Sequence, residues 1–407
     1  MKIKALMATA VGIGLAVAFA PNGVFAQSND GPVKIGVLSD MSGLYADLGG
    51  PGSVEAAKMA IEDIGGKVLG KPVEIVTGDH QNKPDVGANI TRQWFDVDKV
   101  DAITDVPNSG VALAVNEVGR EKNKIMLFSG PAASDLTGEK CSPTTAHWTY
   151  DTYALANGTG AAVVKSGGNT WFFLTADYAF GAALERDTTN VVKANGGTVV
   201  GSVRTPLNAP DFSSFLLQAQ ASKAKIIGLA NAGGDTINSI KQASEFGITS
   251  SGQKLAGLLV FITDVNSIGL QTAQGLQLTE AFYWDQTDET RAFSKKFLER
   301  VKHQPSMVQA GVYSAVRHYL KAVEAVGSKD SAKVMAKMRE TPINDFMTKN
   351  GKLREDGRVV RDMYLFEVKA PKDSKAPWDY YKQIQTIPGE QAFRPMDQGG
   401  CPLVKKG

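Results

Sequence analysis

Ser109 is the residue whose type and position most directly indicate chemistry, namely the binding of an anion. It stands just before residues 111–118, an apolar run that is typical of a helix. A serine at this point can cap the helix with its hydroxyl, while the free N–H groups of the first turn favour a carboxylate. The simpler alternative is that Ser109 only caps the helix and touches no ligand.

Three loops follow expected strands in the first half of the chain and form the candidate binding edge. They are residues 40–49, 107–110 and 130–135. Ligands of open α/β sheets bind outside the carboxyl ends of the strands, so these loops are where a ligand is expected. In the third loop, the small side chains of Ala132 and Ala133 would let a ligand oxygen approach the backbone.

The sequence contains none of the common catalytic or cofactor motifs. No GxSxG elbow, HExxH motif, GxxxxGK[ST] phosphate loop or EF-hand loop occurs. Asp96, Asp98 and Asp101 resemble a carboxylate cluster, but the glycine turn and final Glu of a calcium loop are missing. The four histidines are widely separated in sequence: His80, His147, His303 and His318. We therefore predict a binding protein with no catalytic residue, no metal site and no cofactor.

Two series of alternating strands and helices must position the loops. In the first series, strands are expected at 33–38, 72–79, 102–106 and 124–129, with helices at 52–64, 84–97 and 110–121. In the second, strands are expected at 170–175, 198–205, 225–230 and 255–261, with helices at 179–194, 212–221 and 236–246. Alternation at this spacing predicts two mainly parallel sheets, each covered by helices on both faces.

The order changes in the last third of the chain. A strand at 278–284 precedes three expected helices, at 289–302, 307–326 and 331–339, and a hairpin follows at 361–368 and 380–387. About 380 residues exceed what one hydrophobic core supports, so we predict a two-lobed α/β protein. Residues 32–150 and 285–345 would form lobe 1, and 151–284 and 346–390 lobe 2. A chain that crosses between lobes several times forms a hinge suited to opening and closing.

Residues 1–26 have the pattern of a secretory signal peptide. Lys2 and Lys4 precede an apolar run of about 16 residues, which is shorter than a membrane-spanning helix, and cleavage is expected after Ala26. The chain has 44 basic and 42 acidic residues, so removal of the two lysines makes these equal. Because no basic cluster with interleaved aromatic residues occurs, we expect no nucleic-acid partner. The mature protein is expected in the periplasm as a monomer.

Cys141 and Cys401 are the only cysteines. In an oxidising compartment an even pair is most simply one disulfide, which would tie the tail, residues 391–407, to lobe 1. The alternatives are a metal site, although no CxxC motif or neighbouring histidine is present, and a catalytic thiol.

Several segments together resemble the branched-chain amino-acid-binding family of periplasmic proteins, which serve ATP-binding-cassette importers. They are VKIGVLSDMSG at 33–43, SGPAASDLT from Ser129 and WTYDTY from Trp148. The resemblance covers essentially the mature chain and depends on the order and spacing of these segments. It implies a type I periplasmic-binding-protein fold, a small ligand held between the lobes, and an inner-membrane permease as partner.

The resemblance also implies particular ligand-binding residues. In the family, a serine of the second loop and an Ala-Ala-Thr-type stretch of the third hold the ligand carboxylate, and aromatic lids come from the second lobe. The matching positions here are Ser109, then Ala132, Ala133 and Ser134, and Asn108 of the second loop is a further candidate. Tyr178 and the hinge residues Thr152 and Tyr153 are the nearest matches to the lids.

The sequence departs from the family where the ligand ammonium is held. The acidic residue of branched-chain binders would fall in residues 257–261, which contain none, and Asp264 is the next acid. Burying an ammonium without a partner in a closed cleft costs desolvation free energy. We therefore predict a carboxylate ligand with an apolar or aromatic body, in a slot lined by Tyr45, Tyr178 and Tyr283. The alternatives are a branched-chain or other amino acid, held by Asp264, and a ligand-sensing receptor instead of a transport protein.

Overall fold

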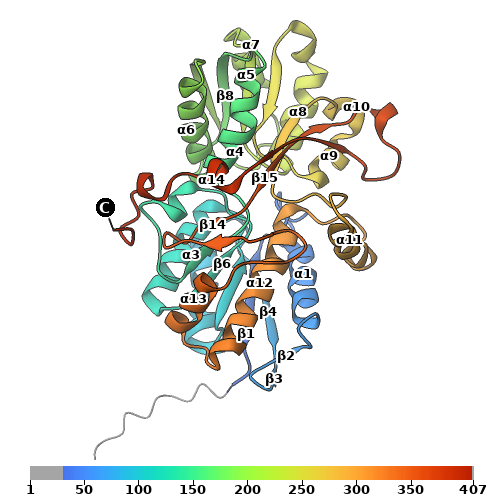
Figure 1. Cartoon of the computed structure of the whole chain (residues 1–407). Coiled ribbons are helices and arrows are strands. Elements are labelled where there is room, and N and C mark those ends of the chain that lie inside the picture. The colour runs from blue at the N-terminus through green and yellow to red at the C-terminus, as the bar shows by residue number, and fades with distance from the viewer. Residues whose placement is uncertain (1–30, 406–407) are drawn as a thin grey trace, which may run out of the picture. The chain divides into compact units, whose positions relative to one another are not determined.

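The first sheet has five parallel strands in the order β4-β1-β5-β6-β7 (Figure 1). This computed structural model describes residues 31–405, so the expected signal peptide lies outside the described residues. The strands are β1 Lys34–Ser39, β4 Glu74–Asp79, β5 Ala102–Asp105, β6 Ile125–Phe128 and β7 Thr145–His147. Four of them were predicted, whereas β7 was missed because three residues are too short for a recognisable pattern.

Helices from two distant parts of the chain pack around this sheet. The early ones are α1 Gly50–Glu62, α2 Pro84–Gln93 and α3 Ser109–Lys122, and the late ones α11 Asp288–Val301, α12 Met307–Val326 and α13 Ser331–Glu340. Helix α12 is buried over most of its length and packs against α1. Gly52 permits this contact, because a Cβ there would lie 2.2 Å from the Nε2 atom of Gln309.

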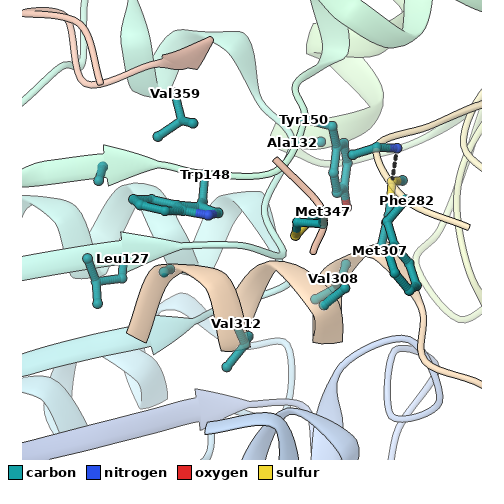
Figure 2. Packing of buried hydrophobic residues seen from close by; sticks show 14 of the residues in the cluster. Leu127, Ala132, Trp148, Tyr150, Phe282, Met307, Val308, Val312, Met347 and Val359 are labelled. Carbon is teal, nitrogen blue, oxygen red and sulfur yellow. Dashed lines mark hydrogen bonds between the residues drawn. The ribbon is translucent and has the colours of Figure 1, made fainter. Parts of the chain in front are cut away.

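A hydrophobic core near the carboxyl ends of the first sheet's strands connects helix α12 to the sheet. Figure 2 shows Val308 and Val312 of α12 next to Leu127 of β6 and Trp148, and all four are buried in one hydrophobic cluster. Trp148 also donates a 2.9 Å hydrogen bond from Nε1 to the Oγ of Ser314. The late helices are therefore part of the framework that holds the strand-end loops.

The second sheet has four parallel strands in the order β11-β10-β8-β9. They are β8 Thr170–Ala176, β9 Thr198–Thr205, β10 Ile226–Ala230 and β11 Lys254–Gly257. Around it lie α5 Ala161–Lys165, α6 Ala179–Ala194, α7 Ser213–Ala221, α8 Gly234–Glu245, α9 Ile262–Ile268 and α10 Leu270–Ala273, with α4 Thr152–Leu155 at its entry. The two parallel sheets establish the predicted α/β class.

The last strands form a separate antiparallel sheet. β15 Met363–Val368 pairs with β12 Gln277–Glu280 on one side and with β16 Tyr381–Ile387 on the other, which confirms the expected hairpin. Two short hairpins, β2 Lys67–Val68 with β3 Lys71–Pro72 and β13 Lys352–Leu353 with β14 Val359–Val360, and helix α14 Gly389–Ala392 complete the regular elements. Single turns of 3-10 or π-helix lie at Trp94–Asp98, Ser134–Thr137, Ala156–Gly160, Thr249–Ser251, Pro371–Asp373 and Met396–Gln398.

Two predicted strands are shorter than expected. The strand predicted at 255–261 ends at Gly257, and Phe261 instead precedes helix α9, where its N–H donates to the Asp264 carboxylate at 3.0 Å. The strand predicted at 278–284 ends at Glu280. In both cases an apolar run continues past the strand, because its side chains fill the core around a loop.

The exchange points between the predicted lobes remain a prediction. Strands of the first sheet come from residues 34–147 and those of the second from 170–257. Arg358, which was expected in lobe 2, forms a bridge with His147 at the edge of the first sheet. Part of the segment 346–390 therefore lies beside the first sheet.

Cys141 and Cys401 form the predicted disulfide, with Cα atoms 5.7 Å apart and a sequence separation of 260. Arg394 of the same tail donates a 2.9 Å hydrogen bond from its guanidinium to the carbonyl of Ser134. The tail is thus fixed to the loop after β6. Within residues 31–405, no helix is long and apolar enough to cross a membrane.

Candidate functional site

A small cavity lies between the loops of the first sheet and those of the second. Its volume is about 10 Å³, roughly enough for one water molecule, so the surrounding side chains are nearly in contact. It is lined by Tyr45, Leu48, Pro107, Gly130, Ala132, Tyr150, Tyr178, Phe180, Ala232, Leu259 and Phe261. These described lining residues are apolar or aromatic, and none carries a charged side chain. A ligand larger than water requires the two sides to move apart.

The loop after β1 is held in place by Asp40. The Asp40 carboxylate accepts hydrogen bonds from the N–H groups of Gly43 at 2.7 Å and Tyr45 at 3.0 Å. The carbonyl of Leu44 then accepts from the N–H of Gly234 in α8, which links the loop to the second sheet. In this arrangement the Tyr45 ring lines the cavity, and its contact with a ligand remains a prediction.

Tyr45 and Tyr178 meet across the cavity through a hydrogen bond between their hydroxyls. Burial raises the pKa of both phenols above the ordinary value, and in Tyr45 the proximity of Tyr178 adds to the effect. Both rings therefore remain neutral at physiological pH and can donate hydrogen bonds.

Tyr150 and Phe261 form an aromatic wall that the sequence reasoning did not select. Their rings pack edge to face with centroids 6.3 Å apart, and the Tyr150 hydroxyl donates to the carbonyl of Gly130 at 2.6 Å. Burial, and next the charge of Asp105, raise the pKa of Tyr150 well above its usual value. Tyr150 is the third residue of the WTYDTY segment, but the sequence reasoning selected its fifth and sixth residues, Thr152 and Tyr153.

Ser109 does not cap its helix, contrary to the expectation. Asn108 is the N-cap of α3, and its side chain accepts from the N–H of Val111 at 3.1 Å. The Ser109 Oγ instead accepts from the N–H groups of Ala132 at 3.2 Å and Ala133 at 3.1 Å. Three of the predicted residues are therefore brought together, and two N–H groups polarise the Ser109 hydroxyl so that its own proton can be donated.

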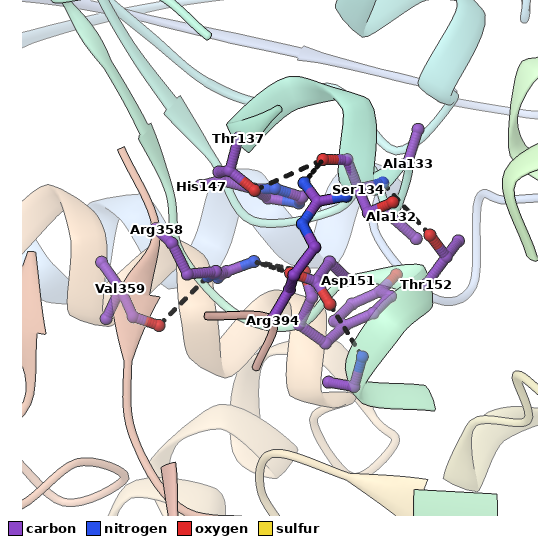
Figure 3. A network of polar contacts seen from close by, with 12 residues as sticks. Ala132, Ala133, Ser134, Thr137, His147, Asp151, Thr152, Arg358, Val359 and Arg394 are labelled. Carbon is purple, nitrogen blue, oxygen red and sulfur yellow. Dashed lines mark hydrogen bonds and ion pairs between the residues drawn. The ribbon is translucent and has the colours of Figure 1, made fainter. Parts of the chain in front are cut away.

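Ser134 and Thr152 do not line the cavity, which corrects their predicted place. Both hydroxyls donate to the same Asp187 oxygen, at 2.7 Å and 2.6 Å, and the Ser134 N–H donates to the Thr152 Oγ1 at 3.1 Å. Arg186 donates to the Ser134 Oγ at 2.9 Å. The two residues thus connect the loop after β6 to helix α6. Figure 3 shows Ser134 and Thr152 together, with Asp151 and Arg358 close by.

Tyr153 and Tyr283 also lie outside the cavity lining. Tyr283 is buried between Phe366 and Tyr381, with ring centroids 5.5 Å and 5.0 Å away, and its hydroxyl donates to the carbonyl of Trp378 at 3.2 Å. Tyr153 is partly exposed on α4. Tyr283 was expected to line the ligand slot, but in this structure its ring packs against the third sheet.

Asp264 is buried directly behind the cavity wall. Its carboxylate accepts from the N–H of Phe261, a lining residue, and burial raises its pKa to about 7. As the helix-capping partner of Phe261, the Asp264 carboxyl is turned to the backbone of α9 in this conformation. It does not itself line the cavity.

Two further buried acids, Asp105 and Glu280, were missed by the sequence reasoning. Each has one carboxyl oxygen without a hydrogen-bond partner among the described residues. Burial raises the pKa of Asp105 to about 7 and that of Glu280 well above its usual value. Both lay inside or at the end of an expected strand, so nothing in the local sequence distinguished them from core positions. Within residues 31–405, no group of His, Cys, Asp and Glu side chains is arranged to hold a metal ion.

Residues 32–375 match the periplasmic binding protein family. The chain belongs to this family. Membership makes it a solute-binding protein rather than an enzyme, and it assigns the two parallel sheets to the type I periplasmic-binding-protein fold.

Solved relatives are similar over almost their whole length. A periplasmic binding protein from Burkholderia mallei is 57% identical with a TM-score of 0.91, and the match covers 92% of this chain and 99% of that one. A branched-chain amino acid ABC transporter periplasmic ligand-binding protein from Burkholderia xenovorans is 45% identical with a TM-score of 0.81, covering 91% and 99%. A solute-binding protein of Rhodopseudomonas palustris in complex with 4-hydroxybenzoate is 25% identical, with a TM-score of 0.78 and coverage of 88% and 98%.

Proposed function

We propose that this protein binds a small carboxylate with an apolar or aromatic body and delivers it to an ABC permease of the inner membrane. It acts as an exported monomer, with the signal peptide removed after Ala26. The two sides of the cavity close on the ligand, because contacts from the second sheet's loops are gained only in the closed form.

The proposal rests on the apolar and aromatic side chains that line the cavity. Leu259 and Phe261 lie at the place where branched-chain binders are expected to carry an acidic residue, and both are buried and apolar. An ammonium brought among such side chains would have no partner, whereas an aromatic ring gains contact area and edge-on packing. The described lining thus favours a ligand with a single anionic end.

We propose Ser109 as the residue that holds the ligand carboxylate. Its hydroxyl is already polarised by the N–H groups of Ala132 and Ala133, and Ala132 lines the cavity. Either the hydroxyl donates directly to the carboxylate, or the two N–H groups exchange the Ser109 oxygen for a carboxylate oxygen. Tyr45 and Tyr178 cover the other end of the ligand.

The relatives are compatible with two ligand classes. The Rhodopseudomonas protein holds an aromatic acid, whereas the Burkholderia xenovorans protein is named for branched-chain amino acids. The second class becomes the better candidate here if Asp264 leaves the N–H of Phe261 and turns towards the ligand when the cavity opens.

A thermal-shift screen followed by calorimetry separates the two classes. The acids are benzoate, 4-hydroxybenzoate and an aliphatic monocarboxylate, and the amino acids are leucine, isoleucine and valine. A ligand at 100 times its Kd stabilises the folded protein by about 2.7 kcal/mol, which raises the melting temperature measurably. We expect stabilisation by at least one acid. Stabilisation by the amino acids alone would overturn the proposal and identify Asp264 as the ammonium partner.

A further inference from the structure

Asp105 lies directly behind the wall of the cavity at the end of the central strand β5. Its carboxyl is fully buried, and one oxygen accepts a 2.7 Å hydrogen bond from the hydroxyl of Ser39. The other oxygen, Oδ1, has no partner among the described residues. A Cβ on Gly130 would lie 2.8 Å from that oxygen and 2.6 Å from the Cα of Pro107. Since Gly130 and Pro107 both line the cavity, the carboxyl lies directly behind this part of the wall.

The backbone at this point adopts an unusual conformation. Asp105 and Val106 have φ angles of 78° and 58°, in the left-handed region that residues with a Cβ rarely adopt. Such strain costs about 1–3 kcal/mol per residue and persists only where the surroundings enforce it, commonly at ligand sites. Here it occurs in two consecutive buried residues immediately before Pro107. These two left-handed residues therefore indicate that the carboxyl end of β5 belongs to a ligand site.

The charges around Asp105 are almost all acidic. Asp40, in the loop after β1, raises the pKa of Asp105, and the charges of Asp105, Glu280 and Asp264 all raise the pKa of Tyr150 in the segment after β7. No described lysine, arginine or histidine forms an ion pair with Asp105. Its neighbours that lower the pKa are neutral hydroxyls: Ser39, which donates the 2.7 Å hydrogen bond, and Ser53. Burial and, less strongly, the charge of Asp40 raise the pKa of Asp105 to about 7. Its charge therefore changes within the physiological range.

We propose that Asp105 determines the charge preference of the cavity, admitting a ligand carboxylate as a neutral acid and repelling it as a carboxylate. This inference rests on the proposed function. A negative charge behind a dry wall acts on a ligand anion with little screening. Binding of the anion therefore draws a proton onto Asp105, and one proton is taken up for each ligand bound at high pH.

The sign of the pH dependence follows from this linkage. Below pH 7 Asp105 is already neutral, so binding needs no proton and is tightest. Above pH 7 the free protein holds a carboxylate that must first be protonated, and each further pH unit weakens binding up to about tenfold. We expect the Kd for 4-hydroxybenzoate to increase about tenfold between pH 6 and pH 8, a range in which the ligand carboxyl stays ionised and its phenol neutral.

The test is calorimetry with 4-hydroxybenzoate on the mature protein and two variants. Asp105→Asn keeps the shape of the neutral acid, so its Kd should stay at the parent's pH 6 value across the range. Asp101→Asn changes another buried carboxyl, which precedes the opposite end of β5 and pairs with Lys329, and should keep the parent's slope. In the parent at pH 8, binding heats measured in two buffers of different ionisation enthalpy should differ by close to one proton per ligand, and at pH 6 by almost none.

The outcomes distinguish this inference from the proposed function. If none of the tested acids binds, the proposed function fails and this inference fails with it. If an acid binds with a pH-independent Kd and no proton uptake, or if the slope survives in Asp105→Asn or disappears in Asp101→Asn, only the role of Asp105 is overturned. The buffer comparison uses the parent protein, so it decides the question even if Asp105→Asn does not fold.

Discussion

The Tyr45 hydroxyl forms a hydrogen bond with the Tyr178 hydroxyl, and 133 residues separate the two in sequence. Tyr45 belongs to the loop after β1 of the first sheet, and Tyr178 immediately precedes α6 at the second sheet. Both rings line the cavity. The bond therefore exists only when the two sheets are in this relative position, and it contributes to the closed form alone.

Removal of this bond should weaken ligand binding without unfolding the protein. Tyr178→Phe leaves the Tyr45 hydroxyl buried without its partner, so we expect about 1–2 kcal/mol of lost affinity, mostly as faster dissociation. Stopped-flow measurements give the dissociation rate and equilibrium titration gives the affinity, both with the ligand found in the screen. Tyr380→Phe is the control, because its hydroxyl contacts Asn266 on the exposed surface. An unchanged dissociation rate in Tyr178→Phe would show that closure does not use the pair.

Ser109→Ala should reduce both affinity and stability. The variant leaves the N–H groups of Ala132 and Ala133 without their acceptor, which costs about 1–3 kcal/mol of folding stability. If the hydroxyl also donates to the ligand carboxylate, affinity falls by roughly 1.5–3 kcal/mol. Chemical denaturation and calorimetry separate the two effects.

Asp330→Ala provides the matched control for Ser109→Ala. Asp330 caps the distant helix α13 and accepts from the N–H of Lys333 at 2.9 Å. Its removal should lower stability by about 0.5–2 kcal/mol and leave affinity unchanged. If Ser109→Ala behaves in the same way, Ser109 supports the loop after β6 and does not hold the ligand.

The disulfide should stabilise the whole fold, because it lowers the conformational entropy of the denatured chain. In the chain-entropy model, closing a loop with a sequence separation of 260 residues contributes about 5 kcal/mol. We expect the double variant Cys141→Ser, Cys401→Ser to melt well below the parent, and reductant to lower the parent's midpoint similarly. Thiol titration of denatured, unreduced protein should find no free thiol. Two free thiols, or equal midpoints, would contradict the prediction.

The fold was predictable where the signal was local and periodic. Alternating apolar strands and helices gave both parallel sheets, and a lone pair of cysteines gave the disulfide. β7 was missed, because Thr145–His147 is short and lacks an alternating pattern. The expected strand at 255–261 broke at Gly257, since the capping contact between Phe261 and Asp264 competes with strand pairing.

The site was predictable only in part, because side-chain direction depends on distant partners. Ser134 has the right type and loop for a ligand contact, but Asp187, 53 residues later, takes its hydroxyl. Tyr283 has an aromatic ring, but the third sheet buries it. Asp105 stands in an apolar strand, and the left-handed backbone that places its carboxyl at the sheet edge cannot be inferred from residue types.

Asp264 should make the protein less stable as the pH rises. Its pKa is about 7 in the folded state, because of burial, against an ordinary value of 3.8. Below pH 4 both states hold the proton, whereas between pH 4 and pH 7 only the folded state keeps it, so the stability contribution is lost across this window and stays lost above it. Asp264→Asn cannot ionise, and its side-chain oxygen can still accept from the N–H of Phe261. We therefore expect it to exceed the parent in stability at pH 8 by about 2–4 kcal/mol and to match it near pH 4. Urea denaturation at both pH values measures the difference, and a variant less stable than the parent at pH 8 would show that Asp264 is ionised and paired in the folded protein.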